Sequence, residues 1–278
     1  PRGGGIAIVA VLVAAGLYLA LIPEAMDVLW LGFVPGLLIV AGIGWWDDHR
    51  PLSPWLRLAV QAVAALSLAA AAGWQSGQWL PAVAAFGMTM VLVNVWNFMD
   101  GINGLAASQA ALAALAYAGL LVGAWHWLAL ALLAACVGFL PFNFPRAWIF
   151  LGDVGSGALG YALAGLATAA FLGLASASVP LLLLPLCAFL VDAGFTLLGR
   201  MLRGEQWWTP HVSHLYQIGA RRLGHAAVTV IYMVFGGVTL LLIYGMPRTT
   251  VVATLGAVIA VYGFGGALWV LLRRGWRS

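Results

Sequence analysis

The chain contains very few charged residues and no lysine. Of its 278 residues, 7% are charged and 64% are hydrophobic, whereas about a quarter of the residues in a soluble globular domain are charged. Many of the apolar runs reach the roughly 20 residues that a helix needs to cross a hydrocarbon layer. The composition therefore excludes a soluble domain and indicates an integral membrane protein.

The chain is also poor in cysteine, and its apolar runs lack the alternation typical of a membrane barrel. Cys136 and Cys187 sit in apolar runs without CxxC spacing, which favours small buried side chains over metal or redox roles. In lipid, only helices and closed barrels satisfy every backbone polar group. Continuous apolar runs therefore predict an all-α fold, a polytopic transmembrane helical bundle.

Hydropathy over windows of about 19 residues predicts ten spans within a single membrane domain, residues 1–278. Short turns containing Gly, Pro or Ser separate several of them. The sequence opens with PRGGG and has no initiating Met, so we expect that it lacks an N-terminal segment. The predicted spans are residues 6–22, 28–46, 55–73, 79–97, 105–123, 127–144, 156–174, 179–199, 226–245 and 250–272.

The arginines predict the orientation of these spans. Ten spans place both termini on one side, and eleven of the twelve arginines fall there, with only Arg248 opposite. Because positively charged residues concentrate on the inner side of a membrane, this side is predicted to be cytoplasmic. The eleven are Arg2, Arg50, Arg57, Arg146, Arg200, Arg203, Arg221, Arg222, Arg273, Arg274 and Arg277.

The carboxylates and histidines gather on the same side, although they were not used to assign it. Only Glu24, Asp27 and His126 fall on the other side. This segregation indicates a site that acts on a polar cytoplasmic substrate. The residues on the inner side are Asp47, Asp48, Asp100, Asp153, Asp192, Glu205, His49, His211, His214 and His225.

Two segments carry the first candidates. Asp47 and Asp48 directly follow the predicted span 28–46 and could bind a divalent metal or transfer a proton. Alternatively they cap a connection, with Ser53 and Pro54 opening the next helix. In NVWNFMDGINGLA, Asn94 and Asn97 share one helix face, and Asp100 follows in a glycine-rich turn. These asparagines could instead join neighbouring helices, but polar groups at membrane depth usually mark function.

Asp153 lies between glycines in FLGDVGSGALGY, just before a helix predicted to start near Ser156. Such a carboxylate stands beside helix N-terminal amides that can receive phosphate, or simply caps the helix. Asp192 lies alone in an apolar run, and we expect it to support the site or to hold Arg200.

The longest polar connection, RMLRGEQWWTPHVSHLYQIGARRLG, carries His211, His214 and Arg203 as candidates for diphosphate contact. Arg221 and Arg222 are assigned to orientation and lipid headgroups. Zinc is not expected, because neither an HExxH motif nor a cysteine partner is present.

Five segments in order, PRGGG, DDHRPLSPWLRL, NVWNFMDGINGLA, FLGDVGSGALGY and PHVSHLYQ, resemble the polyprenyl-phosphate N-acetylhexosamine-1-phosphate transferases of glycosyltransferase family 4. That family includes phospho-N-acetylmuramoyl-pentapeptide transferase. The loop ending in PHVSHLYQ looks like the branch that initiates surface glycans of the O-antigen type. It departs from the histidine-rich run of other members at Leu215, Tyr216 and Gln217. Members of this branch usually have about eleven spans, so one helix would be missing here.

The resemblance implies transfer of an N-acetylhexosamine 1-phosphate from a UDP-sugar to undecaprenyl phosphate, with release of UMP. The expected location is the bacterial inner membrane, with the site facing the cytoplasm. Expected partners are UDP-N-acetylhexosamine, undecaprenyl phosphate and membrane lipids, with a homodimer allowed and no nucleic acid. The expected cofactor is Mg²⁺, with Mn²⁺ as a substitute.

The resemblance also implies roles for individual residues. Asp153 and Asn97 would contact the metal, and Asp153, Asp47 and Asp48 would be catalytic. Asp47 and Asp48 would orient or deprotonate the lipid phosphate, with a metal-linked role left open for either. The remaining substrate-binding residues would be Asn94 and Asp100 at the nucleotide, and His211, His214 and Arg203 at the diphosphate or sugar.

Three other classes of membrane protein agree less well with the sequence. A nucleotide-sugar or lipid-linked sugar transporter should carry its binding residues near the midplane in an inverted repeat, and no repeat is visible. A lipid-binding scaffold explains the arginines but not Asp47, Asn97 and Asp153 together. A CDP-alcohol phosphotransferase would need an Asp-rich signature that is absent.

Overall fold

The computed structural model of the chain describes residues 2–22, 27–206, 209, 211–247 and 250–276. Within these ranges the regular structure is helical, apart from an isolated bridge between Arg2 and Phe150. Eight stretches are long and apolar enough to cross a membrane, and two shorter apolar helices accompany them. The predicted all-α, multi-pass architecture is confirmed. Glu24, Arg248 and Arg277, which entered the orientation argument, lie outside the described residues.

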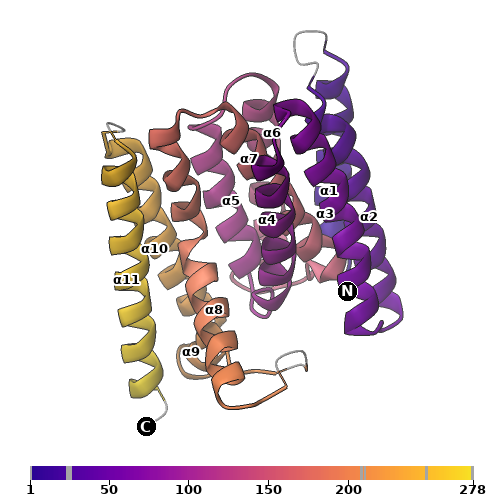
Figure 1. Cartoon of the computed structure of the whole chain (residues 1–278). Helices are drawn as coiled ribbons and strands as arrows, with labels where there is room; N and C mark the ends of the chain where they lie inside the picture. The colour runs from indigo at the N-terminus through magenta and orange to yellow at the C-terminus, as the bar shows by residue number, and fades with distance from the viewer. Residues whose placement is uncertain (1, 23–26, 207–208, 210, 248–249, 277–278) are drawn as a thin grey trace.

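A helical segment corresponds to each of the ten predicted spans (Figure 1). The eighth combines a 3₁₀ stretch, η2, with the helix α8. The segments are α1 (Gly5–Ala20), α2 (Leu29–His49), α3 (Pro54–Ser76), α4 (Trp79–Phe98), α5 (Leu105–Ala118), α6 (Gly123–Asn143), α7 (Gly152–Gly173), η2 (Ser176–Leu186) with α8 (Cys187–Leu202), α10 (His225–Gly245) and α11 (Val251–Gly275).

The eighth span and the connection after it differ from the sequence prediction. The eighth span begins as η2 because Pro180 and Pro185 lie inside it, and proline removes backbone donors from a helix interior. A short additional helix, α9 (Leu215–Leu223), interrupts the polar connection after α8. Windows of about 19 residues cannot detect a helix of this length.

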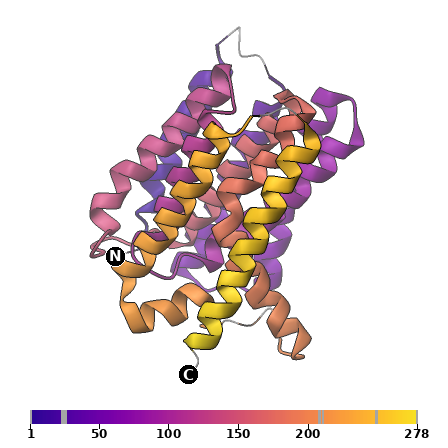
Figure 2. The same ribbon diagram turned by 90° about the vertical axis from the view of Figure 1, so that its left-hand side faces the viewer.

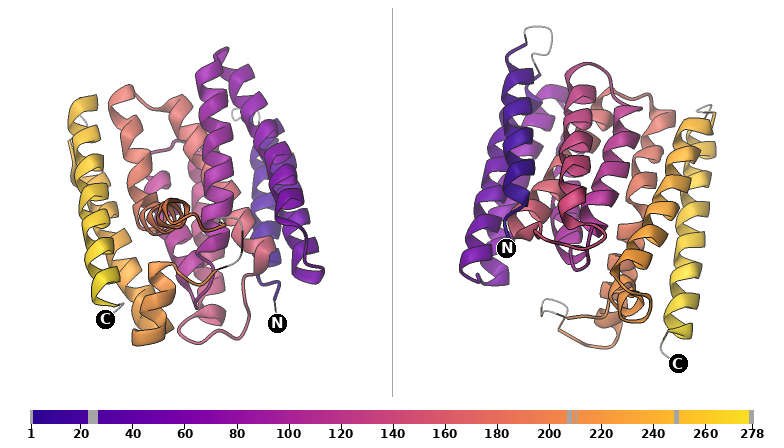
Figure 3. Two further views of the ribbon diagram at one scale, coloured as in Figure 1. Left: turned by 60° about the horizontal axis from the view of Figure 1, so that its bottom comes forward. Right: turned by 180° about the vertical axis from the view of Figure 1, so that it is seen from behind.

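Helix α7 forms the centre of the bundle. Most of its apolar window is buried inside the protein, and it packs against α2 and α4 and also against α1 and α5. Helices α10 and α11 form the opposite edge from α1, α2 and α3 (Figures 1 and 3). Helix α9 and the C-terminal end of α11 lie together at one end of the bundle, at the bottom of Figure 2.

Close packing of α7 on α4 depends on Gly160. A Cβ atom at this position would overlap the backbone carbonyl group of Leu92 in α4. Gly160→Ala is therefore expected to push the two helices apart and to lower the stability by about 2 kcal/mol, or about 5 °C in the apparent melting temperature in detergent.

Gly87→Ala provides the matched control on α4, because a Cβ atom there has nothing within 4 Å. It should leave the melting temperature unchanged or raise it slightly. Equal melting temperatures for the Gly160→Ala variant and the wild type would contradict the packing argument.

Candidate functional site

A polar cavity of about 400 Å³ lies at one end of the bundle, where α4 ends and α3 and α7 begin. Its remaining side is lined by Thr209, His211, His214, Tyr216 and Gln217. Six of the nine predicted site residues line it, namely Asn94, Asn97, Asp100, Asp153, His211 and His214. The other lining residues are Pro54, Trp55, Arg57, Leu58, Gln61, Phe98, Gly101, Thr209, Tyr216 and Gln217.

Arg57 connects two of the predicted carboxylates. Its Nη1 atom donates to Asp47 Oδ2 at 2.8 Å and to Asp153 Oδ2 at 3.2 Å, and the Asp47 side chain is only 10% exposed. Asp47 therefore adjoins the cavity through Arg57.

The sequence predicts Arg57 only as an orienting charge, although its position next to a helix start contains a further signal. Ser53 caps α3 by accepting from Leu56 N at 3.2 Å, and Pro54 is the first residue of the helix, as predicted. Arg57 consequently lies near the positive end of the helix dipole, where a cation is unfavourable without a carboxylate partner.

Asp48 has different partners from Asp47 and caps the central helix. Its Oδ1 and Oδ2 atoms accept hydrogen bonds from the backbone N–H groups of Asp153 at 3.0 Å and Val154 at 3.1 Å. The helix α7 therefore begins at Gly152, not near Ser156 as predicted, and Asp153 lies in its first turn. Gly152 has a φ of +76°, and a Cβ atom there would press on the Asp48 carboxylate, so this junction favours glycine.

The two asparagines of α4 face the cavity from one side of the helix, in agreement with their spacing. Asn94 Nδ2 donates to Gln61 Oε1 at 2.9 Å and to Met90 O at 2.8 Å. Asn97 Nδ2 donates to Ser156 Oγ at 3.2 Å, in the first turns of α7. These bonds link α4 to α3 and α7 and fix both amides at the cavity wall.

Asp100 lies in the turn after α4 and lines the same cavity. Its burial, together with the nearby carboxylates of Asp153 and Asp48, raises the pKa of this carboxyl group well above its usual value. The cavity therefore gathers more carboxylates than its arginine can neutralise, which suits a site that takes up a cation together with its substrate.

His211 and His214 lie against each other, with ring centroids 4.8 Å apart. Ser213 Oγ is 3.0 Å from His211 Nδ1, and His214 stacks on Phe98 and Tyr216. Burial is the main cause that lowers the pKa of His211 to about 4, with the charges of His214 and Arg200 adding to it. Burial likewise lowers the pKa of His214, so both rings are neutral near pH 7 and can donate a hydrogen bond to phosphate.

Arg203 is the predicted site residue that the structure separates from the cavity. Its Nε atom donates to Glu205 Oε1 at 2.6 Å, and its side chain lines a different hollow with Phe195, Leu198 and Arg273. Arg221 donates to the backbone carbonyl of Val212 and does not line the cavity. The polar lining residues that sequence analysis did not assign to the site are Arg57, Gln61, Thr209, Tyr216 and Gln217.

Asp153 and Asn97 both line the cavity and carry side-chain oxygen atoms, and magnesium prefers oxygen ligands. Among the residues that the structure describes, no group of three or more His, Cys, Asp or Glu side chains is placed to hold a metal ion. In phosphoryl-transfer sites Mg²⁺ is usually held by one or two carboxylates and by substrate phosphates. The donor set fits an ion of that kind, completed by the substrate.

The fold and the cavity define a multi-pass membrane protein with a carboxylate- and amide-lined site at one end of its helices. The chain belongs to glycosyl transferase family 4, whose family description matches residues 30–171. The match runs from α2 to α7 and includes Asp47, Arg57, Asn97 and Asp153. The family resemblance seen in the sequence is thereby confirmed.

Curated relatives extend the similarity beyond the matched region. The chain is 30% identical to the decaprenyl-phosphate N-acetylglucosaminephosphotransferase of Mycobacterium tuberculosis, over 99% of this chain and 80% of that protein. It is 30% identical to the probable undecaprenyl-phosphate N-acetylglucosaminyl 1-phosphate transferase of Bacillus subtilis, over 84% of this chain and 70% of that protein. The phospho-N-acetylmuramoyl-pentapeptide-transferase of a Synechococcus strain is 34% identical, over 60% of this chain and 55% of that protein. Each of these names describes a sugar-phosphate transferase.

Proposed function

We propose that the protein transfers N-acetylhexosamine 1-phosphate from a UDP-sugar to undecaprenyl phosphate. The products are a lipid-linked diphosphate sugar and UMP. The names of the relatives support the polyprenyl phosphate acceptor and favour N-acetylglucosamine as the sugar. We further propose that the reaction takes place at the cytoplasmic face of a bacterial inner membrane and initiates a surface glycan of the O-antigen type.

The observation that carries this proposal is the Asp47–Arg57–Asp153 bridge, whose Arg57 and Asp153 line one cavity together with Asn97. Phosphoryl transfer needs alignment and neutralisation of charge more than it needs a protein nucleophile. The cavity combines a guanidinium group held between two carboxylates with amides and neutral imidazoles. It therefore offers hydrogen-bond donors and charges of both signs to a bound substrate. Such a space suits a diphosphate that meets a second phosphate.

The proposed reaction is a displacement at phosphorus. An oxygen of the lipid phosphate attacks the phosphorus atom that carries the sugar, and a new P–O bond joins the two phosphates. The bond from this phosphorus to the bridging oxygen of the nucleotide breaks, and UMP leaves with the electron pair. The sugar–oxygen bond stays intact, so no glycosyl–enzyme intermediate is formed.

Each residue of the site has a separate role in the proposed reaction. Arg57 and Asp47 orient the lipid phosphate, while Asp48 holds the first turn of α7 and so fixes Asp153. Asn94 and Asp100 border the nucleotide. His211 and His214 donate hydrogen bonds to the diphosphate or sugar, and Arg203, which lies outside the cavity, would act only at longer range.

Asp153 and Asn97 would hold Mg²⁺, or Mn²⁺ in its place, and the bound ion would neutralise the phosphate charge. Removing the ion with a chelator is therefore expected to lower turnover by about a hundredfold or more, and added Mg²⁺ should restore it.

The test is the release of UMP by the purified full chain in detergent. UDP-N-acetylglucosamine and UDP-N-acetylgalactosamine are supplied separately, with and without undecaprenyl phosphate. Release that requires the lipid and yields a lipid-linked diphosphate sugar supports the transferase. Folded protein that releases no UMP from either donor, yet moves the intact nucleotide sugar across a vesicle membrane, would replace this proposal with a transporter.

A further inference from the structure

Asp192, in α8, is a carboxylate that lies outside the cavity and yet has many donors around it. It is 1% exposed and is absent from the cavity wall. Five hydrogen bonds end on its two oxygens, at 2.7 to 3.2 Å, from Leu215 N, Tyr216 N, Tyr232 Oη, Trp269 Nε1 and Thr196 Oγ1. Arg200, the partner considered from sequence, instead contacts Gln206 O and Glu205.

Two of these donors are the first backbone N–H groups of α9. Leu215 N donates to Oδ1 at 2.7 Å and Tyr216 N donates to Oδ2 at 3.0 Å. The first N–H groups of a helix have no partner within it, so Asp192 supplies their acceptor from a neighbouring helix. Asp48 does the same for Asp153 and Val154 in α7.

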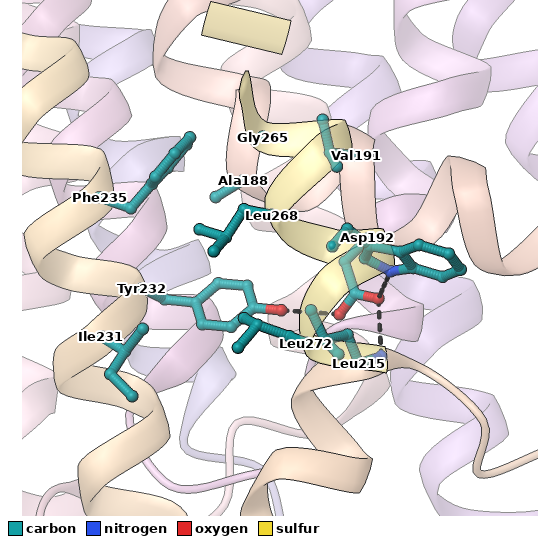
Figure 4. Close-up of a pocket in the computed structure, with 11 residues that line it drawn as sticks. Ala188, Val191, Asp192, Leu215, Ile231, Tyr232, Phe235, Gly265, Leu268 and Leu272 are labelled. Carbon is teal, nitrogen blue, oxygen red and sulfur yellow. Dashed lines mark hydrogen bonds between the residues drawn. The ribbon is translucent and has the colours of Figure 1, made fainter. Parts of the chain in front are cut away.

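The other three donors fix the carboxylate in place. Thr196 lies one turn further along α8, whereas Tyr232 belongs to α10 and Trp269 to α11. Figure 4 shows the carboxylate between the Tyr232 hydroxyl group and the start of α9 at Leu215. Asp192 therefore lies at a junction of four helices and cannot move without breaking several of these bonds.

The start of α9 is also part of the cavity wall. His214, Tyr216 and Gln217 all line the cavity, and the Tyr216 hydroxyl group donates to Phe98 O, at the end of α4, at 2.9 Å. A Cβ atom at Gly101 would collide with the Tyr216 ring. A shift of α9 would therefore displace the segment that holds Asn97 and Asp100.

We propose that Asp192 is a positioning residue of the transferase site. By holding the first turn of α9, it sets the place of His214, Tyr216 and Gln217 opposite Asn97 and Asp153, and so sets the affinity for the nucleotide-sugar donor. This inference rests on the proposed function. It does not require Asp192 to touch either substrate.

The test compares Asp192→Asn with Tyr232→Phe in the full chain. Asparagine keeps the shape but offers one acceptor oxygen in place of two, so at least one of the two backbone N–H groups loses its partner. Tyr232→Phe also removes a hydrogen bond to Asp192 but leaves both backbone bonds in place. Hydrogen exchange of peptides covering residues 211–219, the melting temperature and KM for each substrate are measured.

Asp192→Asn is expected to speed exchange at the start of α9 about tenfold and to raise KM for the UDP-sugar about tenfold. KM for undecaprenyl phosphate should stay within about twofold, and Tyr232→Phe should change neither exchange nor KM. If the two variants behave alike, or if Asp192→Asn lowers only the melting temperature, Asp192 merely joins helices and the proposal is overturned.

A second variant and the exchange measurement test the proposal where Asp192→Asn or the activity assay fails. Should Asp192→Asn fail to fold, Tyr216→Phe removes the bond from α9 to Phe98 without touching Asp192, and a donor KM that does not rise would overturn the proposal. Should the wild type release no UMP, the proposed function fails. Exchange at the start of α9 would then still decide whether Asp192 holds that helix.

Discussion

Replacing Asp153 with asparagine is expected to lower the rate of UMP release about a thousandfold while the protein stays folded. Asp153 lies in the first turn of α7, where it accepts from Arg57 and lines the same cavity as Asn97. Asparagine preserves the shape of the side chain but removes the charge that would hold a cation against the donor phosphates, and such electrostatic contacts are usually the largest contribution to phosphoryl transfer. Initial rates with saturating UDP-sugar and undecaprenyl phosphate measure the loss.

Asp27→Asn is the matched control. Asp27 is also a hydrogen-bonded carboxylate, which accepts from Leu29 N at 2.8 Å and from Trp125 Nε1 at 2.8 Å. It precedes the start of α2, whereas Asp47 lies at the end of that helix, so the two carboxylates are at opposite ends of the bundle. Turnover of Asp27→Asn should remain within about threefold of the wild type. A tenfold or smaller loss in Asp153→Asn would exclude a central role for this carboxylate.

The spans could be predicted because lipid imposes a simple rule on the sequence. Each helix must cross about 30 Å of hydrocarbon and keep its polar groups away from it, and hydropathy alone records that requirement. Hydropathy does not predict helix α9 because this helix is short and polar on one side. Its start is stabilised by Asp192 from another helix. A hydropathy window averages only neighbouring residues, so it cannot detect contacts between residues that are distant in the sequence.

The site could be predicted only in part, for a related reason. The three-residue spacing of Asn94 and Asn97 fixes their common face within one helix, and the structure agrees. The different partners of Asp47 and Asp48 depend on where α3 and α7 approach the end of α2, and no local sequence pattern records that. The same holds for Arg57, whose carboxylate partners are 10 and 96 residues away in the sequence.

The difference between these adjacent aspartates leads to a second large effect. Asp48→Ala is expected to lower turnover about a hundredfold and also to destabilise the protein by about 2 kcal/mol. It leaves the N–H groups of Asp153 and Val154 without their acceptor, and loss of a helix cap costs about 0.5–2 kcal/mol, with more for a buried donor left unpaired. Thermal unfolding in detergent and the rate of UMP release are measured on the same preparation.

Asp47→Ala separates the two effects, because it removes a carboxylate from the same stretch of α2 without uncapping α7. Leu52 N loses its acceptor in this variant, but Leu52 is partly exposed in the connection after α2, so water can take the place of the carboxylate. Arg57 keeps its bond to Asp153. The melting temperature should therefore fall by no more than about 2 °C while turnover still falls about a hundredfold. If Asp47→Ala destabilised the protein as much as Asp48→Ala, capping would not be specific to Asp48. If Asp48→Ala lost stability but kept full turnover, Asp153 would not depend on the cap for its position. The expected pattern, an activity loss shared by both variants and a stability loss confined to one, follows from a single turn of α2 that directs one carboxylate to Arg57 and the next to the N-terminus of the central helix.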